Sequence, residues 1–377
     1  MAEQKLRLGV IFGGRSGEHE VSLMSARSVL DALDAGKYAI TEIGITLDGE
    51  WLVGDEVWQK LKAGETGQLS AAIFLPDPTR RGLYTLKPGS NGAGPAGPFV
   101  MEHFRDLDVV FPVLHGSFGE DGTLQGLFET AEIAYVGAGV LGSSLAMDKG
   151  VFKEVMKEQG IPVLEALVAT RKEVEGLLDV LVARAEKMAP YPLFTKPANL
   201  GSSVGVTKCY NRSDLVEGLM EASRYDRRVL VERGVNGREI EVSVLGNEDP
   251  VASVPGEIRP AADFYTYEAK YHDTRSELLI PAPISFETSE QLRHLAVQAY
   301  KAIDCAGMAR VDFLLDKEDD RLYLNEINTI PGFTQISMYP KLWEASGLPY
   351  PALLDRLIDL ALERKSEGER TERRYER

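Results

Sequence analysis

Short apolar runs alternate with amphipathic segments along the first part of the chain. Leu6 to Phe12 is apolar and β-favouring, it ends in two glycines, and the next segment has apolar residues at helical spacing. The same order recurs at 106–116 and at 133–139, where the second run leads into one helical segment over 143–160. This alternation predicts a parallel, doubly wound first domain.

The pattern changes after residue 160. Strand-like runs dominate up to residue 246, with one helical stretch over 213–223, so a second, mixed domain is predicted to begin near residue 140. Residues 251–283 are aromatic-rich, too polar for a core and too long for an idle connection, which favours a functional lid. The Gly/Pro-rich segment 88–98 is predicted to be a surface loop.

The C-terminal part has two predicted helices and a hairpin. Helical spacing is found over 289–303 and 350–365, and the turn DKEDD separates two alternating strands. The mixed-charge end, GERTERRYER, is predicted to be disordered.

The composition of the chain limits the class of protein and the kinds of partner that it can have. The 377 residues, 44 % hydrophobic and 27 % charged, suit a globular protein of two or three domains. A net charge of -16 argues against nucleic acid as a partner. The two cysteines have no metal-like spacing, the segment MAEQKLRLGVIFGG shows no cleavage-site pattern, and the sequence has no run of about 20 apolar residues. We therefore expect a soluble cytoplasmic protein without a membrane partner.

The hairpin brings acidic groups together. Arg310 and Asp312 are two residues apart on one strand, as are Glu326 and Asn328 on the other, so each pair shares a face. A turn centred near Asp319 places Asp312 opposite Glu326, and Leu314 opposite Leu324. Two carboxylates and an amide oxygen suit Mg²⁺. The alternative is a solvated face with a surface salt bridge.

Two glycine-rich segments are candidates for binding phosphate. In LFTKPANLGSSVGV, a strand delivers Lys196, and Ser202 and Ser203 follow in a loop that offers backbone N–H groups and hydroxyls, although a simple turn is the alternative. Residues 137–142 fit GxGxxG, but about twenty positions later the chain has a Gly-Ile-Pro turn and not the acidic strand end that a dinucleotide site requires. Lys149, just beyond these glycines, can point at a phosphate.

Glu18 and His115 follow the first-domain strands. Ligands bind at the carboxyl ends of strands in open α/β sheets, so both are candidate site residues. The alternative for Glu18 is a carboxylate that complements a helix dipole.

Taken together, these segments resemble the ATP-grasp superfamily and, within it, the D-alanine:D-alanine ligases. The resemblance runs from residue 13 to residue 337 in GGRSGEHEVSL, HGSFGEDGTLQG, SLAMDK, TKPANLGSSVGV, VLVERGVNGREIEVSV, YTYEAKY, ARVDF and LNEINTIPGFTQIS. It implies an α/β fold with a Rossmann-like N-terminal substrate domain (1–140), a central ATP-grasp domain (141–240), a C-terminal ATP-grasp domain (241–364) and a charged tail (365–377). It also implies a homodimer.

The resemblance assigns roles by motif. Groups that would bind ATP are Lys149, Lys196, Ser202, Ser203, Glu232, Glu239 and Lys270. Two Mg²⁺ or Mn²⁺ ions would be held by Asp312, Glu326 and Asn328. Residues that would bind substrate are Glu18, His115, Arg310, Gly332 and Ser337. Catalytic roles would fall to Glu18, Ser202, Tyr271 and Arg310, with Tyr271 in the lid bonded toward Ser202 and Glu18.

The implied activity is ATP-dependent joining of two D-alanines through an acyl phosphate, a carbon–nitrogen ligation that supplies peptidoglycan precursors. The acyl phosphate hydrolyses readily, which gives a lid over 264–271 a purpose. Three alternatives stay open: a ligase forming a D-alanine–D-lactate ester, which the lid tyrosine disfavours, a non-catalytic nucleotide sensor and a nicotinamide-dependent dehydrogenase.

Overall fold

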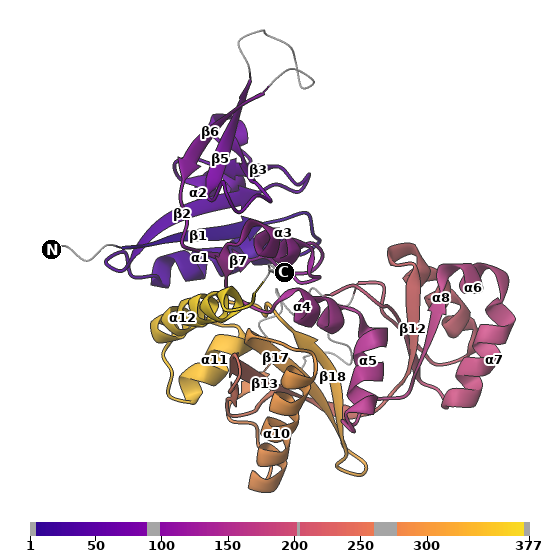
Figure 1. Ribbon diagram of the computed structural model, residues 1–377. Helices are drawn as coiled ribbons and strands as arrows, with labels where there is room; N and C mark the ends of the chain where they lie inside the picture. Colours follow the sequence, from indigo (N-terminus) through magenta and orange to yellow (C-terminus); the bar gives the residue numbers. More distant parts are fainter. Residues whose placement is uncertain (1–4, 89–98, 202–203, 260–276, 373–377) are drawn as a thin grey trace.

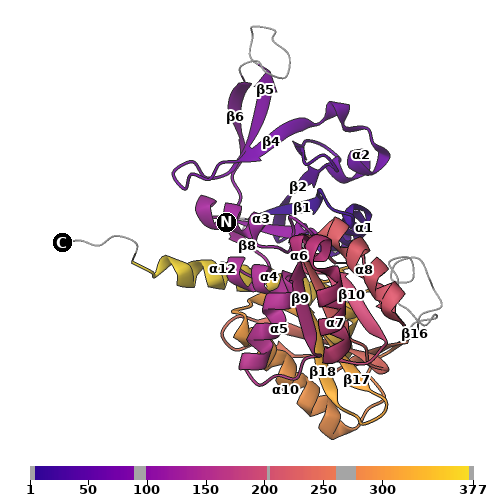
Figure 2. The same ribbon diagram turned by 90° about the vertical axis from the view of Figure 1, so that its right-hand side faces the viewer.

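The computed structural model describes residues 5–88, 99–201, 204–259 and 277–372. These residues form three sheets, one after another along the chain (Figures 1 and 2). Among the described helices, none combines the length and apolar character needed to cross a lipid bilayer.

The first sheet has the strand order β6-β5-β4-β3-β2-β1-β7-β8 in the described residues. Its strands are β1 (Leu6–Gly13), β2 (Tyr38–Ile45), β3 (Trp51–Val53), β4 (Ser70–Phe74), β5 (Leu83–Pro88), β6 (Phe99–Arg105), β7 (Val109–Val113) and β8 (Ala134–Tyr135). The helices are α1 (His19–Ala32), α2 (Val57–Ala63), a 3-10 turn (Thr66–Gln68) and α3 (Thr123–Ala131). β1, β2, β7 and β8 pair in parallel, as predicted for β1, β7 and β8, whereas β2 was missed. The antiparallel extension β3 to β6 was not predicted, and its β5–β6 hairpin projects from the molecule (Figure 1).

The second sheet has the order β11-β10-β12-β9. Its elements are α4 (Val140–Met147), α5 (Lys149–Glu158), β9 (Ala166–Thr170), α6 (Arg171–Gly176), α7 (Leu178–Met188), β10 (Leu193–Pro197), β11 (Thr207–Cys209), α8 (Arg212–Tyr225) and β12 (Arg228–Arg233). The single helix predicted over 143–160 is wrong, because Asp148 leaves helical geometry and its carboxylate caps α5 by accepting from the N–H groups of Gly150 and Val151. α6 and α7 were missed, although Thr170 and Glu173 form a capping box.

The third sheet has the order β16-β15-β13-β17-β18, and β14 pairs with β13. Its elements are β13 (Gly237–Gly246), β14 (Val251–Ala252), β15 (Gly256–Arg259), β16 (Glu277–Leu279), α10 (Phe286–Ala302), β17 (Gly307–Asp316), β18 (Leu322–Asn328), α11 (Met338–Ala345) and α12 (Tyr350–Glu369). The predicted disorder of GERTERRYER (368–377) was wrong for its first two residues, because α12 continues to Glu369. The end of the tail and the loop over 89–98 lie outside the described residues.

The register of the β17–β18 hairpin decides which side chains share a face. Asp312 pairs with Glu326 and Arg310 with Asn328, as predicted. The register shifts after Asp312, so Leu314 pairs with Tyr323 rather than with Leu324. The bulge moves the lower hairpin by one position and leaves the acidic pair in place.

The first and third domains share a core. Val10 and Phe111 of the first sheet belong to the same buried cluster as Leu353 and Leu357 of α12. The GxGxxG glycines lie at this junction: a Cβ on Gly307 would be 3.1 Å from the backbone nitrogen of Gly137. Protein backbone thus packs directly on this loop, and nothing in the described structure favours a dinucleotide there.

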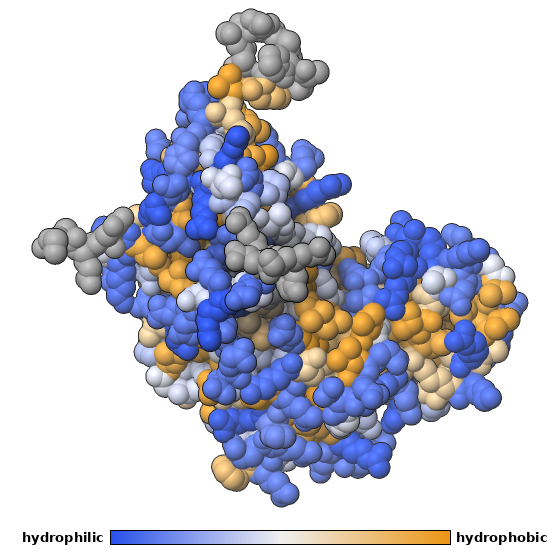
Figure 3. All heavy atoms as spheres, viewed as in Figure 1, coloured by the Kyte–Doolittle hydropathy of each residue, from blue (hydrophilic) through white to orange (hydrophobic). Residues whose placement is uncertain are grey.

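The surface in Figure 3 is mostly hydrophilic. Exposed apolar side chains gather on α4 and α5, at the α6–α7 corner and near the outer end of β6, at Val140, Leu141, Val151, Leu177, Val180, Phe99, Val100 and Met101. None of these residues lines either of the two cavities described next.

Candidate active site

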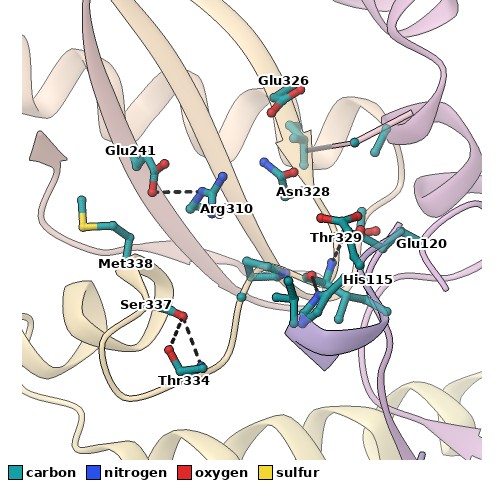
Figure 4. Close-up of a pocket in the computed structure, with 18 of the residues that line it drawn as sticks. His115, Glu120, Glu241, Arg310, Glu326, Asn328, Thr329, Thr334, Ser337 and Met338 are labelled. Atoms are coloured by element: carbon teal, nitrogen blue, oxygen red, sulfur yellow. Dashed lines mark hydrogen bonds and ion pairs between the residues drawn. The ribbon is translucent and has the colours of Figure 1, made fainter. Parts of the chain in front are cut away.

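Two neighbouring cavities meet between the three sheets. The smaller, of about 320 Å³, is lined by α1, by the loop after β7 and by the segment from β18 into α11 (Figure 4). The larger, of about 940 Å³, lies between the second and third sheets. Residues lining both are Lys149, Gly201, Glu241, Ile258 and Glu326. Groups bound in the two cavities would therefore face the same side chains.

The hairpin places its polar residues at this boundary. Asn328 donates from Nδ2 to Asp312 Oδ2 at 2.9 Å, and Arg310 donates to both Asp312 oxygens at 2.7 and 2.6 Å. Arg310 also pairs with Glu241 at 3.0 Å, as Figure 4 shows. Although burial opposes its charge, Asp312 and Glu241 raise the pKa of Arg310 well above its ordinary value. Arg310 is thus a fixed cation.

The acidic pair fits magnesium by the chemistry of its donors. Asp312 and Glu326 face each other across the strands, and Lys149 Nζ lies 3.4 Å from Glu326 Oε2. No cluster of three His, Cys, Asp or Glu residues suited to a metal occurs in the described chain, so the set is two carboxylates plus the amide of Asn328. Mg²⁺ is commonly held in this way, with substrate phosphates completing its shell.

In the loop after β10, the two residues Asn199 and Leu200 are held by hydrogen bonds to neighbouring elements. Asn199 donates its backbone N–H to Asp226 at 2.8 Å and its side-chain amide to Asp148 at 3.2 Å. Lys149 Nζ donates to the carbonyl of Leu200 at 3.0 Å. Lys149 therefore lies at this loop, and its predicted role at a phosphate stays a prediction. Ser202 and Ser203 lie outside the described residues.

A buried ionic triad lies at the other end of the larger cavity. Glu232 of β12 pairs with Lys196 of β10 at 2.5 Å and with Lys153 of α5. Burial opposes ionisation, but the two ammonium groups together lower the pKa of Glu232 to about 2. Lys153 was missed, although it lies four residues after Lys149 and hence on the same helix face. Glu239, on β13, lines the same cavity.

The candidate site residues Glu18 and His115 both line the smaller cavity. Glu18 is the N-cap residue of α1, but its side chain makes no capping hydrogen bond. A methyl group on Gly201 would lie 3.1 Å from Glu18 Oε2, so the carboxylate faces the loop after β10. His115 Nδ1 contacts the Ile330 carbonyl at 2.9 Å, and its Nε2 lies 3.0 Å from Ser25 Oγ. Burial lowers the pKa of His115.

Glu120 also lines the smaller cavity, and it was not predicted as a site residue. It lies in HGSFGEDGTLQG, one of the segments that carry the family resemblance. Its two oxygens accept from the N–H groups of Gly116 at 2.7 Å and of Ile330 at 3.0 Å. Burial, followed by the neighbouring Glu18 carboxylate, raises the pKa of Glu120 to about 8.

The far end of the smaller cavity holds Gly332 and Ser337. Ser337 Oγ accepts from the N–H of Thr334 at 3.1 Å and bonds its hydroxyl at 2.7 Å. Lys341, one turn into α11, also lines the cavity. Among the described residues Lys341 has no ion-pair partner, whereas Lys149 and Arg310 are both paired. Tyr271 and Lys270 lie outside the described residues.

Comparison with known proteins agrees with this geometry. Residues 7–138 match the family model "D-ala D-ala ligase N-terminus", and residues 155–359 match "D-ala D-ala ligase C-terminus". The chain belongs to the D-alanine–D-alanine ligase family. Curated relatives named D-alanine–D-alanine ligase include one from Heliobacterium modesticaldum, 50 % identical with 97 % of each chain covered, and one from Thermoanaerobacter sp., 51 % identical with 97 % of this chain and 98 % of the relative covered.

Solved structures of similar proteins show the same architecture. The D-alanine-D-alanine ligase from Coxiella burnetii is 37 % identical, with 97 % of each chain covered and a TM-score of 0.78. The VanG D-Ala:D-Ser ligase from Enterococcus faecalis is 34 % identical, with 95 % of this chain and all of that chain covered and a TM-score of 0.81. The fold is therefore the ATP-grasp fold implied by the sequence.

Proposed function

We propose that this protein joins two molecules of D-alanine into D-alanyl-D-alanine, converting ATP to ADP and phosphate, for the synthesis of peptidoglycan precursors. The observation that carries the proposal is the shared wall of the two cavities, at Lys149, Glu241 and Glu326. A nucleotide in the larger cavity would present its γ-phosphate where an amino acid in the smaller one presents its carboxylate.

In the first step the carboxylate of the first D-alanine attacks the γ-phosphate. Asp312, Glu326 and Asn328 would hold Mg²⁺, which when bound would supply positive charge for the phosphoryl oxygens. Lys149, held between Glu326 and Leu200, adds a positive charge beside the transferring group. Lys196, Ser202, Ser203, Glu232, Glu239 and Lys270 bind the rest of the nucleotide, while Glu18 takes the substrate ammonium.

In the second step the free amine of the second D-alanine attacks the acyl carbon, and phosphate leaves. The negative charge on the tetrahedral oxygen is met by Arg310 and by the N–H of Gly332. Ser337 and Lys341 bind the carboxylate of this second amino acid. Lys341 suits the role because, among the described residues, it is the lining cation without an acidic partner.

The same family resemblance supports a homodimer in the cytoplasm, with Tyr271 closing the site. Ester formation with D-lactate remains the alternative within the family, and no described residue favours it.

ATP turnover by the purified protein tests the proposal. We expect ADP release only when D-alanine and Mg²⁺ are both present, with D-alanyl-D-alanine as the product. ADP release that ignores D-alanine would refute it.

A further inference from the structure

The loop 329–333, which carries Gly332, is held at three backbone points by side chains of the first domain. Glu120 accepts the N–H of Ile330 at 3.0 Å, and the His115 ring contacts the carbonyl of the same residue at 2.9 Å. Ser25 of α1 accepts the N–H of Phe333 at 3.2 Å. Figure 4 shows His115 and Glu120 beside Thr329 at the cavity wall.

The hydrogen bonds of this network have one consistent direction. The Ile330 carbonyl can only accept, so Nδ1 of His115 carries the proton, and a neutral ring then leaves Nε2 as an acceptor. Ser25 Oγ, 3.0 Å away and buried, donates to Nε2 while it accepts from Phe333. Both ring nitrogens of His115 are therefore engaged by protein.

These contacts leave one backbone N–H of the loop 329–333 available for the reaction. Between the fixed residues lie Pro331, which has no N–H, and Gly332. In the part of the chain that the structure describes, the Gly332 N–H has no hydrogen-bond acceptor. Its neighbours on both sides are tied to the first domain, which also carries Glu18.

We propose that Glu120, with His115 and Ser25, acts as an interdomain clamp that positions the Gly332 N–H at the reacting carbonyl, with Glu120 as a positioning residue for the second chemical step. This inference rests on the proposed function. The clamp ties the site that binds the first substrate to the group that meets the developing oxyanion. Errors in this placement cost rate because oxyanion donors act only over short distances.

The test separates the two chemical steps. ATP labelled with ¹⁸O in the β,γ-bridge scrambles its label when the acyl phosphate forms and reverts, whereas dipeptide reports completion of the second step. We expect Glu120→Gln, which puts an amide donor against one of the two N–H groups, to lower dipeptide formation about 10-fold to 100-fold. The ratio of isotope exchange to dipeptide should then rise at least about tenfold. Ser25→Ala should change the ratio in the same direction.

Glu129→Gln is the matched control. Glu129 lies on α3 of the same domain and bonds the Tyr135 hydroxyl at 2.8 Å, away from the clamp, so its ratio should stay at the wild-type value. A purely structural role for Glu120 would lower both steps together, and a wild-type ratio in Glu120→Gln and Ser25→Ala would overturn the inference. If the wild-type protein makes no dipeptide, the proposed function itself has failed.

Discussion

Removing the Lys153 ammonium should destabilise the protein strongly, because the buried Glu232 carboxylate then keeps only one of the two ammonium groups that balance its charge. Glu232 and Lys153 are 3 % and 2 % exposed, and Lys196 is the other partner of the carboxylate. Breaking a buried ion pair by removing one member costs about 3 to 5 kcal/mol. We expect Lys153→Met, which keeps most of the side-chain volume, to lose this much free energy of unfolding at pH 7.

The loss should depend on pH in a defined direction. The native pKa of Glu232 is lowered from 4.5 to about 2, so its ionisation contributes stability above about pH 4.5 that is lost as the pH falls toward 2. In Lys153→Met the native pKa of Glu232 rises, and protonation relieves the unpaired charge at a higher pH. The difference in unfolding free energy between wild type and variant should therefore shrink between pH 7 and pH 3.

Urea unfolding across this pH range measures the effect, with Lys157→Met as the control. Lys157 lies one turn further along α5, is exposed and contacts Glu154 at only 3.5 Å, so its loss should change stability by no more than about 0.5 kcal/mol. Lys153→Met should also raise KM for ATP. Without Lys153, the Lys196 ammonium is needed to balance the charge of Glu232 and is less available to bind a phosphate. A loss below about 1 kcal/mol at pH 7, or one that does not change with pH, would refute this reasoning.

Three further predictions concern residues of the proposed site. Glu326→Gln should abolish ADP release while the melting profile stays native, and retained turnover at saturating Mg²⁺ would make the hairpin structural only. Lys341→Gln should raise KM for the second D-alanine about tenfold, as expected for a lost charged hydrogen bond; with D-alaninamide as the acceptor it should change little, and equal effects on both acceptors would remove Lys341 from carboxylate binding. Tyr271→Phe should keep substantial ligase activity and raise the share of D-lactate product in competition with D-alanine, most at lower pH, as scored by mass spectrometry. An unchanged product ratio would leave Tyr271 as a packing residue.

The parts of the site that the sequence predicted depend on local geometry. Arg310 and Asp312 share a face because side chains alternate along a strand, and the short turn brings Glu326 opposite Asp312. The bulge after Asp312 shifted the rest of the register, which alternation alone does not reveal. The family resemblance added residue roles that no spacing rule supplies.

The missed residues depend on contacts distant in sequence. Glu120 bonds Ile330 across 210 positions, so only the folded chain shows that it reaches the loop of Gly332. In the sequence, Lys153 cannot be told from an ordinary helix residue, because its partner Glu232 is distant along the chain. The antiparallel strands β3 to β6 were missed; β3, with three residues, is too short to show an alternating pattern.

The central claim is best tested by ADP release measured side by side with D-alanine, L-alanine and D-lactate, each with Mg²⁺, and with the products identified by mass spectrometry. We expect rapid ADP release and D-alanyl-D-alanine with D-alanine, and neither with L-alanine or with D-lactate alone. Equal release with all three, or release with D-alanine that yields no dipeptide, would contradict it.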